Sequence, residues 1–169
     1  MTPIGERLLE LTRLRYETFP LLLESMQPDS TGGMGDPISR LVKCHLLSEV
    51  ALDKLLELAF APNGAAVLSG RLSYSQKLRI ASRCELAPGF DLLPDFIVGS
   101  LKSLNKLRNR LAHEIHAEVT EEEVMALFAG HEEDTLKDLS TMSVSELIYN
   151  YTPFLFGNML PKYERIDDE

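Results

Sequence analysis

The chain has 169 residues, of which 44% are hydrophobic and 25% charged, and its formal net charge is −9. This composition excludes a disordered chain, and the sequence has no run of about 20 apolar residues, the length a membrane helix needs. We expect one domain, residues 1–169, in the cytoplasm, because no secretion leader is present and Cys44 and Cys84 are too few for a disulfide framework.

The first predicted helix begins at Thr2-Pro3, where a capping hydroxyl precedes a proline. It continues to about Met26. Pro20 lies inside this helix and removes one backbone hydrogen bond, so we expect a kink or a break near Tyr16. The glycines and the proline of residues 27–35 then predict a loop.

Asp36-Pro37 repeats the pattern of a cap followed by a proline and opens a long second helix, which ends before Pro62. Residues 62–70 are predicted to form a loop. A short third helix is expected over Ser73–Glu85, and Pro88-Gly89 stops it.

The fourth helix is predicted from Pro94 to about Glu114, with apolar residues at a spacing of three and four. Two capping boxes, Thr120–Glu123 and Ser143–Glu146, open the fifth and sixth helices, which span about 120–162. No alternating strand pattern, internal repeat or glycine-rich phosphate loop is apparent. The sequence therefore predicts an all-α, single-domain bundle of about five to six helices.

Charge is distributed unevenly along this acidic chain. Residues 71–110 carry 8 positive and 3 negative charges, whereas residues 111–169 carry 3 positive and 14 negative charges. The acidic total argues against broad affinity for nucleic acid, because binding to a polyanion depends on lysines and arginines. Any such affinity is therefore expected in the basic middle segment.

The fourth helix presents two different faces. At about 100° per residue, its apolar positions form one stripe, while Lys102, Lys106, Asn109 and His113 fall in one column roughly opposite. Arg110 borders this column. The two lysines make this column suitable for binding an anion. The column ends in His113, and histidine is the side chain that titrates near neutrality. The alternative is an ordinary solvent-exposed helix face, which would have the same composition. A histidine near the carboxyl end of a helix interacts favourably with the helix dipole even without a ligand.

Arg108 lies near the edge of the apolar stripe, about 140° from His113 on an ideal helix. A single straight helix therefore does not bring the two side chains onto one small group. A twofold homodimer would place two copies of the helix face to face. On the second helix, Glu49 is predicted to orient Arg108 through an ion pair, with Asp53 or simple exposure to water as alternatives. His45 is expected to be a core histidine.

The run Arg108-Asn109-Arg110-Leu111-Ala112-His113 resembles the motif of the HEPN superfamily of helical domains, in which an arginine and a polar residue precede a histidine. The long second helix is similar to that of the family. The segments Leu72–Ala81 and Leu104–Glu114 are similar to its mannitol operon repressor branch. The likeness covers residues from about 38 to 115.

The resemblance implies a metal-independent endoribonuclease that needs no cofactor and pairs two motifs across a dimer cleft. His113 would act as general base or acid, Arg108 would hold the phosphate, and Asn109 would orient the site. Lys102, Lys106 and Arg110 would guide the RNA backbone. The resemblance also implies an antitoxin or a regulatory protein as partner, although Ile115 stands where toxins paired with a nucleotidyltransferase often carry tyrosine.

A second hypothesis stays open on the same resemblance. The chain would then be a catalytically silent module that binds protein partners and regulates transcription or defence. A DNA-binding repressor is a weaker alternative, because no helix-turn-helix with a basic recognition helix is apparent.

Overall fold

Helix α3 (Pro37–Ala59) is the central element of the fold. Its cap forms as the sequence predicts: the Asp36 carboxylate accepts hydrogen bonds from the Ser39 backbone N–H and hydroxyl, both at 2.8 Å, and Pro37 follows in the first turn. The computed structural model describes residues 3–18, 20, 24, 36–114, 116–130 and 133–159. Within them the structure is all-α apart from one short hairpin.

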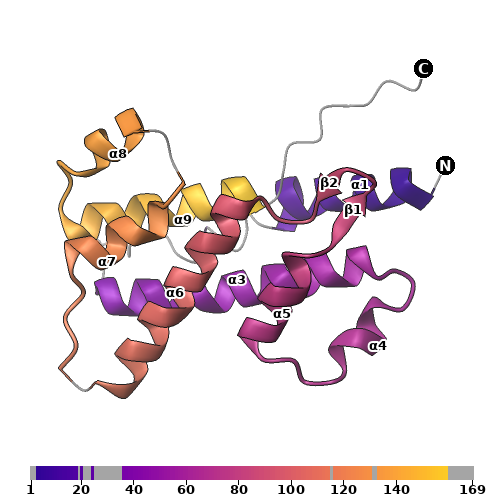
Figure 1. Ribbon diagram of the computed structural model, residues 1–169, viewed down its shortest axis with the longest axis horizontal. Coiled ribbons are helices and arrows are strands. Elements are labelled where there is room, and N and C mark those ends of the chain that lie inside the picture. Colours follow the sequence, from indigo (N-terminus) through magenta and orange to yellow (C-terminus); the bar gives the residue numbers. More distant parts are fainter. Residues whose placement is uncertain are drawn as a thin grey trace.

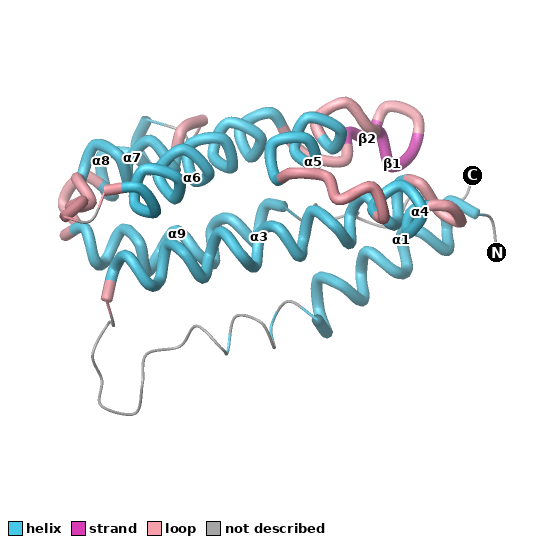
Figure 2. The backbone as a smooth tube through the Cα atoms, turned by 90° about the horizontal axis from the view of Figure 1, so that it is seen from below, coloured by secondary structure: helices cyan, strands magenta, loops and turns pink. Residues whose placement is uncertain are grey.

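Figure 2 shows two layers of helices. One layer contains α3, α1 (Pro3–Arg13) and α9 (Val144–Met159). The other contains α5 (Tyr74–Ala81), α6 (Asp95–His113) and α7 (Glu121–Met125). Helix α3 contacts α1, α5, α6 and α9, so it forms the floor on which α5 and α6 lie. The core between the layers consists mainly of leucines, with Ile97 and Tyr151.

Helix α1 continues into a π-helical turn, Leu14–Thr18. The distortion falls around Tyr16, where the sequence predicts a kink because the proline at position 20 has no N–H to donate to that turn. The predicted end near Met26, the loop 27–35 and residues 160–162 of the last helix lie outside the described residues.

The third predicted helix is shorter than expected and is followed by strands. Helix α5 ends at Ala81, and β1 (Glu85–Ala87) pairs antiparallel with β2 (Phe90–Asp91). Gly89, with φ of 79°, allows the turn between them. The hairpin was not predicted, because five residues of strand are too few to give a period-two pattern.

Three further short elements differ from the prediction. Helix α4 (Gly64–Leu68) lies in the predicted loop 62–70, and the 3₁₀ turn Ala126–Phe128 and α8 (Glu133–Leu139) lie within 120–162, where two helices are expected. The capping boxes at Thr120 and Ser143 form as predicted and begin α7 and α9. In the described part of the chain the number of α-helices is therefore eight, against the five to six expected.

The course of the chain in Figure 1 places α5 and α6 side by side in opposite directions. At one end the Leu92 backbone N–H donates to the Cys84 carbonyl at 2.8 Å, and at the other Asn105 Nδ2 donates to Ser75 Oγ at 3.2 Å. No helix among the described residues is long and apolar enough to cross a membrane.

Candidate functional site

Helix α6 separates an apolar face from a cationic one. Ile97, Leu101, Leu104 and Leu107 are buried against the other layer. This burial turns the opposite column outward, and Lys102, Lys106, Asn109 and His113 are all exposed. The helix has no acidic residue after Asp95, so its exposed face is positive along its length.

Arg108 is half-buried on the side of α6 that faces α3 and α5. Its Nη1 atom donates a hydrogen bond to Asn109 Oδ1 at 3.2 Å. Its charge is close enough to the buried His45 of α3 to help keep the pKa of that imidazole low. Among the described residues no hydrogen bond joins Arg108 to His113, in keeping with the angle of about 140° between them on one helix.

A buried polar network lies beneath the Arg108 side of α6. His45 Nε2 is 3.1 Å from Asn105 Oδ1, and the imidazole stacks on the Tyr74 ring at 4.2 Å. The Tyr74 hydroxyl is 2.9 Å from Ser48 Oγ, which donates to the His45 carbonyl at 2.7 Å. These bonds join α3, α5 and α6, so they fix the position of α6, which carries Arg108 and His113, on α3 and α5.

His45 is thus a core histidine, as predicted, but it is incompletely satisfied. Its Nδ1 atom is buried with no hydrogen-bond partner among the described residues. Burial lowers the pKa of His45, the bond to Asn105 opposes that effect, and the Arg108 charge lowers the pKa further.

The predicted ion pair between Glu49 and Arg108 is not the one that forms. Lys77 Nζ of α5 lies 2.9 Å from the carboxylates of both Glu49 and Asp53. These two acids are one turn apart on α3, so one ammonium reaches both. Glu49 therefore ties α5 to α3.

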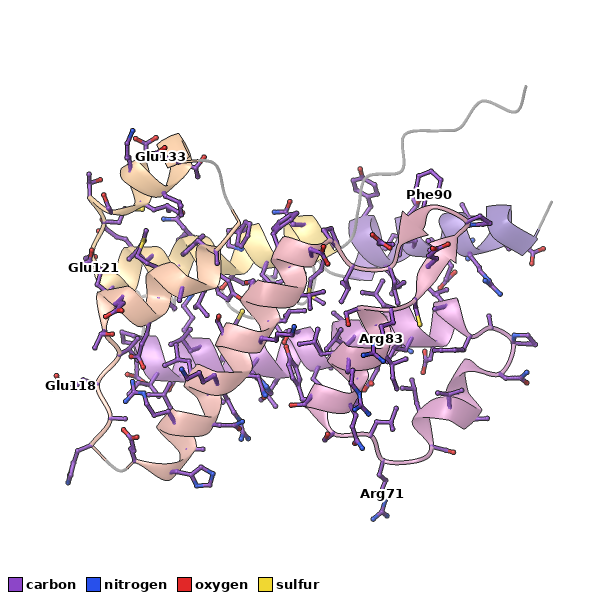
Figure 3. All side chains as sticks on the ribbon, in the orientation of Figure 1. Arg71, Arg83, Phe90, Glu118, Glu121 and Glu133 are labelled. Atoms are coloured by element: carbon purple, nitrogen blue, oxygen red, sulfur yellow. The ribbon has the colours of Figure 1, made fainter. Side chains whose placement is uncertain are left out.

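The sequence predicts that Arg110 guides the RNA backbone. In the structure Arg110 is instead engaged within the chain. Its guanidinium donates to Glu114 Oε2 at 3.0 Å, to the Glu118 carbonyl at 2.7 Å and to Glu123 Oε2 at 2.7 Å. Glu114 and Glu123 raise the pKa of Arg110. Figure 3 shows Glu118 and Glu121 along the segment that turns from α6 towards α7, which Arg110 holds in place.

A small cavity of about 130 Å³ opens between α6 and α7, beside the cationic column. The residues that line it are Ser103, Lys106, Leu107, Arg110, Glu123 and Ala126. Arg110 and Glu123 pair with each other within this lining, so their charges offset one another there. In the described part of the chain no group of three or more histidines, cysteines and acids is placed to hold a metal ion.

No family model, curated protein or solved structure matches the chain.

Sequence reasoning missed Asn105 and Tyr74 as members of the network around His45. The position of Asn105 could have indicated its role, because it is a polar residue close to the apolar stripe of α6. Tyr74 gave none, since an aromatic residue at a helical spacing is typical of ordinary core packing.

Proposed function

We propose that this chain is a metal-independent endoribonuclease of HEPN type that works as a homodimer. The observation that supports it best is that Asn109 and His113 are exposed beside the half-buried Arg108, in the last turns of a helix that has no acid after Asp95. A guanidinium, an amide and an imidazole are the groups needed to cleave RNA through its own 2′-hydroxyl. The exposed Lys102 and Lys106 would attract the phosphate backbone.

In the proposed reaction His113 accepts the proton of the ribose 2′-hydroxyl. The 2′-oxygen forms a bond to the adjacent phosphorus while the bond from phosphorus to the 5′-oxygen breaks. Arg108 stabilises the negative charge that develops on the phosphoryl oxygens, and the leaving 5′-oxygen takes a proton from water. The products are a 2′,3′-cyclic phosphate and a free 5′-hydroxyl, and no metal ion takes part.

The angle between Arg108 and His113 is the reason for proposing a dimer. One helix points the two side chains in directions about 140° apart, whereas two helices related by a twofold axis can direct an arginine and a histidine to one phosphate. In this arrangement each site combines Arg108 of one subunit with His113 of the other.

The direct test incubates the purified chain with single-stranded RNA in excess chelator. We expect cleavage by the wild type, loss in His113→Ala and in Arg108→Ala, and retention in His116→Ala. His116 is an exposed histidine three residues beyond His113, so it is a matched control. Absence of cleavage by a folded wild-type dimer would overturn the proposal.

Mixing the two inactive variants tests how the site is assembled. If Arg108 and His113 act across the dimer, a mixed dimer of His113→Ala and Arg108→Ala subunits contains one complete site and regains cleavage. If both residues act from the same subunit, every site in the mixture lacks one of them and activity stays absent. Measured recovery therefore decides between the two arrangements.

A second candidate function is a catalytically silent module that binds an antitoxin or a regulatory protein. The observation in its favour is that Leu46 and Val50 of α3 are 52% and 45% exposed. They lie one turn apart on α3, and the exposed Lys43 lies one turn before Leu46, a pattern suited to a partner whose apolar contact is bordered by acidic residues. If the wild-type chain neither binds nor cleaves RNA, the result favours this module. RNA binding without cleavage would not favour it.

A further inference from the structure

The exposed arginines around α5 have no part in the chemistry described above. Arg71, Arg79 and Arg83 are exposed, and residues 71–84 include no acid. Among the described residues no ion pair takes up their guanidinium groups. The fourth cation of the segment, Lys77, points inward and pairs its single charge with both Glu49 and Asp53 of α3.

The antiparallel packing of α5 on α6 brings these arginines level with the lysines of α6. Ser75 contacts Asn105, and the backbone of Cys84 contacts that of Leu92. Arg79, one turn after Ser75, therefore lies near the level of Lys102, one turn before Asn105. In Figure 3, Arg71 projects from the loop between α4 and α5, and Arg83 lies near the end of α5.

We call the exposed cations of α5, of the turn after it and of α6, taken together, the α5–α6 track. It comprises the exposed cations Arg79, Arg83, Lys102 and Lys106 and leads to His113 at the end of α6. From Lys102 to His113 the helix rises about 16 Å, which is longer than one nucleotide step. The acids at the far end, Glu85, Asp91 and Asp95, belong to the hairpin and to the start of α6.

We infer that the α5–α6 track binds the phosphate backbone of single-stranded RNA several nucleotides away from the bond that is cleaved. The inference rests on the proposed function, in that RNA is taken as the ligand. A group of exposed cations matches the charge of a polynucleotide strand and does not read its bases. The substrate is then an extended strand and not a dinucleotide, and Arg79 and Arg83 contribute affinity without touching the reacting atoms.

The test measures RNA binding separately from cleavage, in a His113→Ala background, by fluorescence anisotropy at several salt concentrations. The test variant is Arg79→Gln/Arg83→Gln, and the control is Arg13→Gln/Lys54→Gln, which removes the same charge from α1 and α3. We expect the test variant to lose about tenfold in affinity for a strand of about a dozen nucleotides, with a salt slope shallower by about 0.7 per lost contact. The control should change little.

A dinucleotide provides the second arm of the test. It reaches Arg108 and His113 but is too short for the track, so its cleavage should be equal in the wild type and in Arg79→Gln/Arg83→Gln. Equal affinity of test and control variants for the long strand would overturn the inference while leaving the proposed cleavage intact. Binding of the long strand through the track without cleavage by the wild type would overturn the proposed ribonuclease and retain the inference. No RNA binding by any variant would overturn both.

Discussion

Arg110 Nη2 lies 2.7 Å from Glu123 Oε2, and this ion pair joins the last turns of α6 to the first turn of α7. The same Glu123 oxygen accepts the Thr120 backbone N–H at 3.1 Å in the capping box that begins α7. The Glu123 carboxylate therefore both caps the start of α7 and attaches α7 to α6. A residue that the sequence suggests for RNA binding is occupied in holding α7.

Arg110→Gln should loosen α7 and leave the rest of the fold intact, because it removes the partner of Glu114 and Glu123. Hydrogen exchange would show faster exchange of the amides of residues 116–128 than in the wild type. Lys102→Gln removes the same charge from an exposed position of α6 and should leave these amides unchanged. Equal exchange in the two variants would contradict a structural role for Arg110.

Lys77→Met should be strongly destabilising. Its side chain is 11% exposed and compensates two carboxylates, which would be left close together on α3 without a counter-charge. Both acids are about one-third exposed, so water lowers the penalty below that of a fully buried pair, to about 2 kcal/mol. Urea denaturation measures this loss.

The combination Lys77→Met/Glu49→Gln/Asp53→Asn is the matched rescue for that variant. It removes both unpaired charges, so much of the stability lost in Lys77→Met should return. A triple variant no more stable than Lys77→Met would show that packing of the lysine stem, and not its charge, is what matters.

His45 predicts a loss of stability in mild acid. Burial holds its pKa below the ordinary value of 6.5 in the folded chain, and the nearby Arg108 charge adds to this effect. As pH falls below 6.5, His45 becomes protonated in the unfolded chain but stays neutral in the folded chain. The free energy of unfolding therefore decreases until the pH reaches the pKa of His45 in the folded chain. The melting temperature measured from about pH 7.5 to about pH 5 should therefore fall.

His45→Gln should flatten that part of the profile, because the neutral amide can still bond to Asn105 without a proton to gain. His116→Gln, at an exposed position, should keep the wild-type profile. The same pH dependence in both variants would rule out His45 as its source.

Tyr151→Phe should lower the free energy of unfolding by about 1.5 kcal/mol. The Tyr151 hydroxyl is 2.8 Å from Ser100 Oγ, and both residues are 0% exposed, so removal of one partner leaves the other buried and unbonded. Tyr151→Phe/Ser100→Ala removes both polar groups and should be closer to the wild type than the two single losses added together. Strict additivity in thermal or urea unfolding would count against this bond.

Local patterns in the sequence were sufficient to predict the main helices. The cap at Asp36 and the boxes at Thr120 and Ser143 involve residues three apart, so their hydrogen bonds form wherever the chain is helical. The spacing of leucines in α6 likewise indicated which face is buried and which presents Lys102 and His113. The hairpin 85–91 and the short helices α4 and α8 have too few residues for any period to be read from them.

Partnerships between charged and polar groups required the tertiary structure. Glu49 bonds to Lys77, 28 residues away, and His45 to Asn105, 60 residues away, and no spacing rule connects such pairs. Arg110 and Lys106 look alike in the sequence, yet the first is held by Glu123 while the second stays exposed. The amino-acid sequence by itself thus determined which helices form and which faces they bury, because those depend on neighbours within two turns. Only the packing of helices distant along the chain decided which cations remain free to meet a ligand.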